Sequence, residues 1–302
     1  MTLLSHYTSR AGLEGMARSR SFWATNFLEL NDANEFFYAW GILQRDAYVE
    51  SMKVMPDDLK RPDFDLEAGL QTAKQQFRDL LSGAEGYGHV YVTSFARGTT
   101  DYHDRQGIMT LWERYTQHQG YCLQFEREDL ENTLRLDSWR SNYATLGLQD
   151  IKYGVNKNTH TYRDLVFQFA QQMILQVARA HRDARIEPAW DRMWADSYLQ
   201  REMLDFCSTH KDPCWEDERE VRLFCCPVPQ ADARVFTGIA SAPKIKKTPA
   251  GKRYVEIGHQ WRPGIRPRRI LIGTHANRDI SAALGHYESV PEVGYAALPL
   301  AS

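Results

Sequence analysis

The chain has 302 residues, long enough for one large domain or two small ones, and its formal net charge of −2 excludes a global basic field. Its five cysteines lack the spacing of a zinc site or of a disulfide scaffold, which indicates reduced thiols. The start has no basic, apolar leader and no run reaches about 18 apolar residues, so we expect a cytoplasmic protein without a membrane span.

Short strands and helices alternate through the first half of the chain. Runs of β-branched and aromatic residues indicate the strands, and apolar residues three or four apart indicate the helices. Strands are predicted over residues 3–8, 21–25, 89–95 and 120–125, and helices over residues 9–19, 31–49, 67–81 and 108–115. The polar residues 97–105 predict an irregular loop.

The second half combines long helices with further strands. Apolar residues repeat at helical spacing over residues 162–181, and residues 188–208 have the same character. These two stretches predict a helical insertion over residues 156–210. Strands are predicted over residues 220–226, 254–257 and 269–272. The resulting fold class is α+β, with a single domain over residues 1–302 that contains the insertion.

Polar side chains at the end of the opening strand form the first candidate site. His6, Tyr7 and Thr8 can present several hydrogen-bonding groups to a cleft, and a capped strand end would also explain them. A second polar group, which begins at Asn31, can close one side of a ligand cleft. Helix capping alone explains that group, so on spacing the capping interpretation is the stronger one.

An aromatic pair forms the third candidate. Trp112 and Tyr115 are three residues apart, so a helix would place them on one face. Such a pair is typical of a buried core. It can also provide a stacking surface for a flat heteroaromatic ring.

The most informative segment follows Trp215. A strand that begins near Glu218 would place Glu218, Glu220 and Arg222 on one face. Two carboxylates at this spacing repel each other unless a cation or a ligand uses them. Two interpretations stay open: a solvated edge strand with a ladder of ion pairs, or a carboxylate held beside developing positive charge.

Four short motifs follow one another along the chain, and their order carries a resemblance to a known family. They are His-Tyr-Thr-Ser from residue 6, Leu-Asn-Asp-x-x-Glu from residue 30, Leu-Trp-x-x-Tyr from residue 111 and Trp-x-x-Glu-x-Glu-x-Arg from residue 215. This order resembles a bacterial family of unknown function, which in turn is similar to the histidine–tyrosine–glutamate branch of the ADP-ribosyltransferase superfamily. The resemblance leaves out residues 55–85 and 149–210. It implies a split β-sheet core with a helical insertion.

The resemblance also implies roles for the candidate residues. Glu220 or Glu218 would be the catalytic glutamate, and we favour Glu220 because we expect it inside a rigid strand, whereas Glu218 borders a polar loop. Tyr115, or as second choice Trp112, would stack on nicotinamide. The full set of residues expected to bind NAD, which is a substrate here, is His6, Tyr7, Thr8, Asn31, Trp112 and Tyr115. No metal ligand is predicted.

The function that follows is an NAD-dependent mono-ADP-ribosyltransferase, acting as a toxin or an anti-phage defence effector. The toxin relatives and the basic residues 262–269 favour a nucleic acid, RNA or DNA, over a protein as the acceptor. By analogy we expect a neutralising antitoxin or chaperone. Two alternatives remain: a non-catalytic module that binds a nucleotide or a partner, and a nuclease that uses Glu218 and Glu220 with Mg²⁺.

Overall fold

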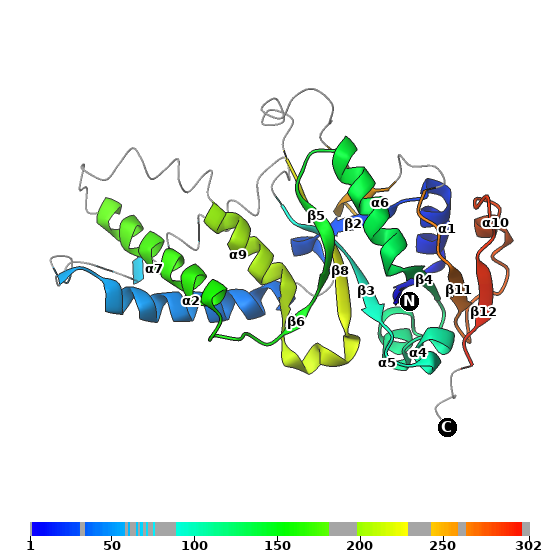
Figure 1. The fold of residues 1–302 in the computed structure, drawn as a ribbon, viewed down its shortest axis with the longest axis horizontal. Coiled ribbons are helices and arrows are strands. Elements are labelled where there is room, and N and C mark those ends of the chain that lie inside the picture. Colours follow the sequence, from blue (N-terminus) through cyan, green and yellow to red (C-terminus); the bar gives the residue numbers. More distant parts are fainter. Residues whose placement is uncertain are drawn as a thin grey trace. The chain divides into compact units, whose positions relative to one another are not determined.

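The computed structural model describes residues 2–30, 34–57, 60, 65, 67–68, 71, 75, 89–180, 198–228, 243–258 and 264–297 (Figure 1). The chain forms two compact units. The first comprises Met1–Leu30, Tyr87–Ile151 and Cys214–Ser302, and the second comprises Asn31–Gly86 and Lys152–Pro213. The helical insertion predicted over residues 156–210 therefore falls in a unit that also takes in residues 31–86.

A mostly antiparallel β-sheet forms the centre of the first unit, which confirms the α+β class. Ten strands of the described chain belong to it, and only the pairing of β11 with β12 is parallel among the pairs they form. The strands are β1 (Leu3–Thr8), β2 (Phe22–Asn26), β3 (Tyr91–Arg97), β4 (Tyr121–Glu126), β5 (Tyr143–Asp150), β8 (Glu220–Pro227), β9 (Ile245–Lys247), β10 (Arg253–Ile257), β11 (Arg269–Ile272) and β12 (Glu292–Tyr295). Their order is β12-β11-β4-β1-β3-β2-β10-β9, while β8 pairs with β3 and β5 pairs with β8.

Short helices complete the first unit. They are α1 (Arg10–Ser19), η1 (Phe27–Glu29), α4 (Asp101–Gln106), α5 (Met109–Leu111), η3 (Trp112–Thr116), α6 (Arg127–Arg140), η4 (Pro213–Glu218) and α10 (Ser281–Leu284). Helix α1 begins where the sequence predicts, because the Ser9 hydroxyl accepts a hydrogen bond from the Gly12 N–H and caps the first turn. Helix α6 packs on β4 and β5, and α1 contacts α10 (Figure 1).

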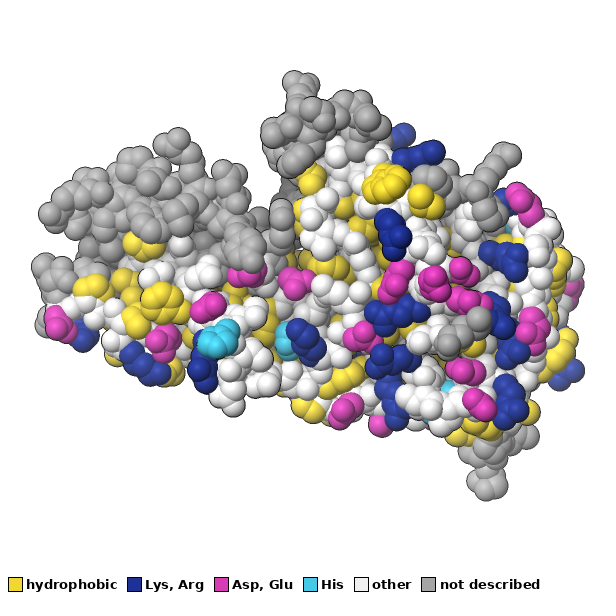
Figure 2. Space-filling model, viewed as in Figure 1, with side chains coloured by type: hydrophobic (Ala, Val, Ile, Leu, Met, Phe, Trp, Pro, Cys, Tyr) yellow, Lys and Arg dark blue, Asp and Glu magenta, His cyan; other side chains and the backbone are white. Residues whose placement is uncertain are grey.

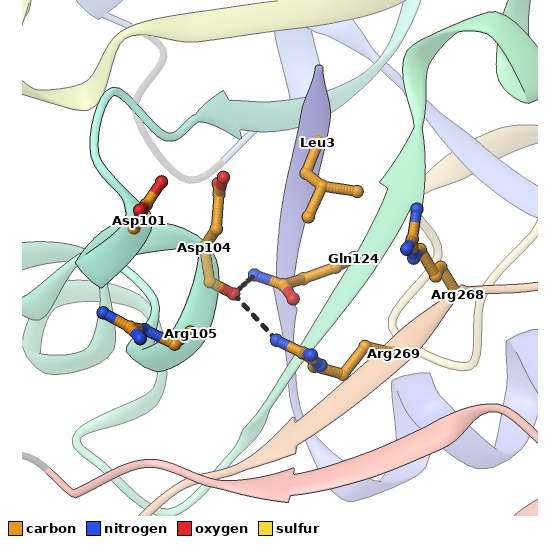
Figure 3. Close-up of a pocket in the computed structure, with 7 residues that line it drawn as sticks. All are labelled: Leu3, Asp101, Asp104, Arg105, Gln124, Arg268 and Arg269. Carbon is orange, nitrogen blue, oxygen red and sulfur yellow. Dashed lines mark hydrogen bonds between the residues drawn. The ribbon is translucent and has the colours of Figure 1, made fainter. Parts of the chain in front are cut away.

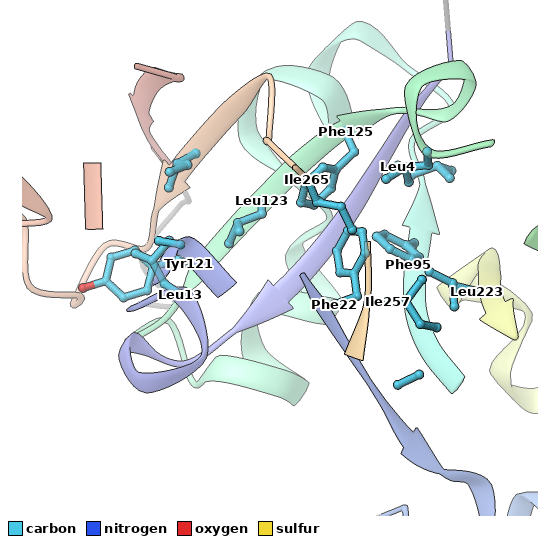
Figure 4. Close-up of a cluster of buried hydrophobic side chains, with 14 of the residues drawn as sticks. Leu4, Leu13, Phe22, Phe95, Tyr121, Leu123, Phe125, Leu223, Ile257 and Ile265 are labelled. Atoms are coloured by element: carbon cyan, nitrogen blue, oxygen red, sulfur yellow. The ribbon is translucent and has the colours of Figure 1, made fainter. Parts of the chain in front are cut away.

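Alternation along the strands places an apolar layer on one face of the sheet. Phe22, Phe95 and Phe125 come from three different strands and meet edge to face, with ring centroids 5.0–6.0 Å apart. Figure 4 shows these rings together with Leu4 and Leu123. Since neighbouring residues of a strand point to opposite faces, the residues between these positions face the other side of the sheet.

Strand β3 has three strand neighbours, although a strand has only two edges. One edge pairs with β8 from Tyr91 to Ala96. The other edge pairs with β2 at Tyr91 and Val92 and with β1 at Ala96 and Arg97. Residues 93–95 lie between these two pairings and join neither ladder. The sheet is therefore split between β1 and β2, along the middle of β3.

Among its described residues, the second unit contains three helices and a small parallel sheet. The elements are α2 (Asn34–Val54), α7 (His160–Ala180), α9 (Tyr198–Thr209), β6 (Lys152–Tyr153) and β7 (His210–Lys211). Helix α2 packs against α7 and α9. Trp40 lies against Phe169 with ring centroids 5.4 Å apart, and the Tyr162 hydroxyl donates to Asp46 over 2.8 Å. Within the described residues, the structure contains no helix that is both long and apolar enough to cross a membrane.

The prediction of a loop over residues 97–105 is wrong for residues 101–105, which belong to helix α4. Thr100 caps this helix, because its hydroxyl accepts from the His103 N–H over 3.1 Å. Asp101 and Asp104 in the first turn also favour the helix through its dipole.

The helix predicted over 108–115 exists as α5 followed by the π-helical turn η3. The helix predicted over 67–81 and residues 188–197 of a second one lie largely outside the described residues.

We predict that the aromatic layer carries much of the stability of the first unit. Phe125→Ala removes a buried ring that touches two others, and should lower the free energy of unfolding by about 3–5 kcal/mol. Trp139→Ala on helix α6 is the control, because this side chain is 69% exposed and its loss should change stability by less than about 0.5 kcal/mol. Urea unfolding measures both values. Equal losses for the two variants would contradict this account of the core.

Candidate functional site

A cavity of about 220 Å³ lies at the split in the sheet, within the first unit. Side chains from β1, β2, β3, α5, η3, η4 and β8 surround it, so residues far apart in the sequence meet there. Its lining consists of Ser5, His6, Tyr7, Trp23, Thr25, Leu30, Val92, Thr93, Ser94, Phe95, Ala96, Leu111, Tyr115, Glu218 and Glu220. Four of the predicted site residues are thereby brought together with Tyr7: His6, Tyr115, Glu218 and Glu220.

His6 bridges the split. Its Nδ1 lies 2.9 Å from the backbone oxygen of Ser94, one of the residues of β3 that join neither ladder. A carbonyl oxygen only accepts hydrogen bonds, so in neutral imidazole Nδ1 carries the proton and Nε2 is left as an acceptor. Burial lowers the pKa of His6 and outweighs the opposing effect of the Ser94 hydrogen bond, which favours this neutral form. His6 can therefore accept a hydrogen bond from a ligand hydroxyl.

Glu220 forms a buried ion pair with Arg222. The Arg222 Nε and Nη2 donate to the two carboxylate oxygens over 2.6 and 2.9 Å, and the two side chains are 6% and 2% exposed. They are two residues apart on β8, on one face of the strand, as predicted. The two-pronged contact fixes the plane of the Glu220 carboxylate at the wall of the cavity. Strand β8 lies between β3 and β5 and is buried throughout, so the interpretation as a solvated edge strand is wrong.

Glu218 reaches the same cavity from a different element. The strand does not begin at Glu218 as predicted, because Arg219 has a left-handed backbone (φ 46°) that ends turn η4 before β8 starts at Glu220. The expectation of a loosely held Glu218 is also wrong. Its side chain is buried, pairs with Arg114 and accepts a hydrogen bond from the Tyr115 hydroxyl over 3.0 Å. The Arg114 guanidinium in turn lies 4.4 Å from the centre of the Trp215 ring.

The two aromatic candidates separate. Tyr115 lines the cavity and is 53% exposed. Trp112 is fully buried: its indole N–H donates to the Gln106 oxygen over 2.8 Å, and its ring packs edge to face on Tyr7. The predicted shared face is lost because the π-helical turn η3 does not keep the spacing of an α-helix. Trp112 therefore belongs to the core and does not line this cavity.

The remaining predicted residues have different places. The Tyr7 hydroxyl accepts from the Ile108 N–H, which ties β1 to α5 at one wall of the cavity. Thr8 pairs with Tyr121 in the sheet and does not line the cavity. Asn31 lies outside the described residues.

Several residues of the site were not identified from the sequence, and Arg114 and Thr93 are the most informative of them. Arg114 stands inside the Leu-Trp-x-x-Tyr motif, but only the fold shows that it meets Glu218, 104 residues away in the sequence. Thr93 lines the cavity, and its buried hydroxyl has no hydrogen-bond partner within the described chain. A buried polar group without a partner is costly, so this hydroxyl is a candidate to bond a ligand. Thr93 stands in a run of β-prone residues, and nothing in that run indicates that its hydroxyl lines a cavity.

The charged groups of the cavity are arranged as guanidinium–carboxylate pairs. Arg222 pairs with Glu220 and Arg114 pairs with Glu218, so each carboxylate is held beside a cationic group. Among the described residues, no three His, Cys, Asp or Glu side chains are grouped so that they could hold a metal ion. The arrangement suits an organic ligand with hydroxyl groups and a flat ring, which His6, the carboxylates and Tyr115 can contact.

Residues 111–223 match a family described as protein of unknown function (DUF2971). The matched segment contains Trp112, Tyr115, Glu218 and Glu220, whereas His6 precedes it. The match agrees with the expected resemblance to a family of unknown function, and its description names no reaction. No curated protein and no solved structure matches the chain.

The lowered pKa of His6 predicts a loss of stability in acid. The unfolded chain protonates this imidazole below about pH 6.5, whereas the folded chain keeps it neutral to a lower pH. The contribution of His6 is therefore fully present above about pH 6.5 and falls as the pH drops toward the folded pKa. His6→Gln should show a smaller decrease in the free energy of unfolding between pH 7.5 and 5.5 than the wild type in urea titrations.

The matched control is His275→Gln, since His275 is an exposed residue outside the cavity. We expect this variant to keep the pH dependence of the wild type. An unchanged pH dependence in His6→Gln would contradict the placement of a neutral imidazole in the split.

Proposed function

We propose that the chain is a mono-ADP-ribosyltransferase that uses NAD as its substrate. The observation that carries this proposal is the meeting of His6, Tyr115, Glu218 and Glu220 around one cavity at the split in the sheet. These are the residues to which the resemblance assigns ribose binding, nicotinamide stacking and catalysis. The split β-sheet itself agrees with the core that the resemblance implies.

The reaction needs a fixed negative charge beside the nicotinamide ribose. The bond between ribose C1′ and the nicotinamide nitrogen breaks, and nicotinamide leaves with the bonding electrons. Positive charge then develops on the sugar, as in glycoside cleavage. A nucleophile of the acceptor forms the new bond to C1′ and releases its proton to solvent. A carboxylate that is already in place stabilises this charge more in the transition state than in the ground state.

We assign this role to Glu220. The two hydrogen bonds from Arg222 orient the carboxylate, and the strand holds its backbone, so little reorganisation is needed when charge develops. The assignment to Glu220 rests on this orientation, since both glutamates are buried. Glu218 is assigned a positioning role, because its carboxylate accepts from the hydroxyl of Tyr115 and so holds the ring that faces the cavity.

His6 and Tyr115 complete the proposed NAD site. The unprotonated Nε2 of His6 accepts a hydrogen bond from a ribose hydroxyl, since its Nδ1 is engaged by Ser94. The exposed ring of Tyr115 stacks on the flat nicotinamide. Neither group needs to change its charge during the reaction, so both serve to hold the sugar in the reactive orientation.

The acceptor is proposed to be a nucleic acid, RNA or DNA, and the cellular role that of a toxin or defence effector with a neutralising partner. These proposals come from the resemblance and from the basic residues 262–269, of which 264–269 are described. On the face of the first unit in Figure 2, basic and acidic side chains alternate, and no one-sign field covers it. A nucleic acid would therefore bind there through local contacts.

We predict that Glu220→Gln lowers NAD cleavage by about 10²-fold or more, because it removes the charge and keeps the shape. The readout is release of nicotinamide from labelled NAD, together with transfer of label to a cell lysate. Glu218→Gln should weaken transfer and leave residual NAD cleavage. Glu113→Gln is the control, since this glutamate is exposed in the Leu-Trp-x-x-Tyr motif and does not line the cavity.

Glu220→Gln leaves the buried Arg222 without its ionic partner, which costs stability. The double variant Glu220→Gln with Arg222→Gln removes both charges and should regain stability without regaining activity. Normal cleavage by Glu220→Gln together with loss in Glu218→Gln would transfer the catalytic role to Glu218. Binding of NAD without any turnover would favour the non-catalytic module, and an NAD-independent nuclease activity abolished by chelators would favour the Mg²⁺ alternative.

A further inference from the structure

The first unit contains a second cavity, of about 330 Å³, beside strands β4 and β11 (Figure 3). It shares no lining residue with the cavity at the split. Its walls come from β1, α4, β4 and the start of β11. The lining residues are Leu3, Asp101, Asp104, Arg105, Gln124, Arg268 and Arg269.

Gln124 supplies the observation that points to a ligand. The side chain is fully buried, and its Nε2 donates to the backbone oxygen of Asp104 over 2.8 Å. Since that backbone oxygen only accepts, the orientation of the amide is fixed and Oε1 is the free end. Within the described chain this Oε1 has no hydrogen-bond partner. A buried acceptor without a donor costs about 1–3 kcal/mol, so a ligand N–H at this position would satisfy it.

Guanidinium groups stand on both sides of this amide in Figure 3. Arg269 is held in place by Glu292 over 2.7 Å and by the Asp104 oxygen over 3.3 Å, and Arg268 pairs with Glu126. Arg105 is exposed, and in the part of the chain that the structure describes its side chain makes no ion pair or hydrogen bond. Its planar set of donors is thus available to an anionic group, and phosphate matches that geometry.

Asp101 and Asp104 place carboxylates in the same wall. Carboxylates accept hydrogen bonds from hydroxyl or amino groups, so the cavity offers both cationic and acceptor groups within one volume. Leu3 adds an apolar contact. A matching ligand carries an anionic group for Arg105, hydroxyl or amino donors for the carboxylates and an N–H donor for the Oε1 of Gln124.

We propose that this cavity binds a nucleoside monophosphate. Arg105 binds the phosphate, the carboxylates accept from the sugar hydroxyls, and the Oε1 of Gln124 accepts an N–H from the edge of the base. A free amino acid also carries an anion and N–H donors, but it is small for a cavity of about 330 Å³ and brings no hydroxyl-bearing spacer. The inference does not depend on NAD cleavage at the split, because none of its residues lines that cavity, although Arg268 and Arg269 also belong to the basic residues 262–269.

Isothermal titration of the full chain tests the inference, with AMP, GMP, CMP and UMP as probes and with adenosine and inorganic phosphate as fragments. We expect at least one mononucleotide to bind more tightly than either fragment. Arg105→Ala should raise its Kd by about tenfold or more, while adenosine binding stays unchanged. Arg135→Ala is the control, because this arginine is exposed on helix α6 and does not line the cavity.

Gln124→Leu tests the role of the amide. It removes the unpaired acceptor together with the Nε2 donor to the Asp104 oxygen, which keeps its contact with Arg269. The two effects on stability oppose each other, so the variant should stay folded and lose the preference among the four bases. Unchanged nucleotide affinity in Arg105→Ala, or binding of phosphate as tight as that of every nucleotide, would overturn the inference. Loss of NAD cleavage in Arg105→Ala would show that the cavity holds part of NAD and would overturn a separate site. Normal NAD cleavage with lost mononucleotide binding would support it.

Discussion

The candidate site depends on one edge of strand β3, the edge that β1 and β2 share. Two strands share this edge, β2 at one end and β1 at the other, so the residues between them have backbone groups that no ladder uses. Unpaired backbone groups inside a protein need other partners. His6 supplies one through its bond to the Ser94 oxygen, and the same split leaves room for the cavity. The split in the sheet therefore both creates the cavity and requires the His6 imidazole as a partner for the β3 backbone.

Two ion pairs hold the charged groups at the wall of the cavity: the buried pair of Glu220 with Arg222, and the pair of buried Glu218 with exposed Arg114. A buried carboxylate without a partner would destabilise the fold. Arg222 is the partner of Glu220 and Arg114 is the partner of Glu218, although both groups of the first pair lose their contact with water. Such pairs are poor devices for stability alone. Their presence at the wall of a cavity is better explained by a need for fixed charge, which is what the proposed reaction requires.

Much of the fold could be predicted from local sequence. Strand β1 and helix α1 were correct because a β-prone run and a serine cap act over a few residues. Helix α4 was missed, since its cap stands in a stretch without apolar periodicity. The elements α6 and β5 were not predicted either, because helix α6 has few apolar positions and β5 acquires its pairing only from β8.

Some features of the candidate site could likewise be predicted from local sequence, and others could not. The residue types at Glu218, Glu220 and Tyr115 could be read from the motifs, because two close carboxylates are unusual in any strand. The left-handed backbone of Arg219 and the π-helical turn η3 could not, since both depend on packing. The left-handed backbone of Arg219 takes Glu218 out of strand β8, and the turn η3 directs the Trp112 side chain into the core. Contacts across the sequence, such as Arg114 with Glu218, follow only from the assembled fold.

The measurement that tests the central claim most directly is a crystal structure of the chain with NAD or with an analogue that resists cleavage. The account predicts that the nicotinamide ribose occupies the split in the sheet. Its hydroxyls should lie within hydrogen-bonding distance of the His6 Nε2 and the Glu220 carboxylate, with nicotinamide against Tyr115. Binding of NAD elsewhere in the molecule, with the cavity at the split unchanged, would contradict the account.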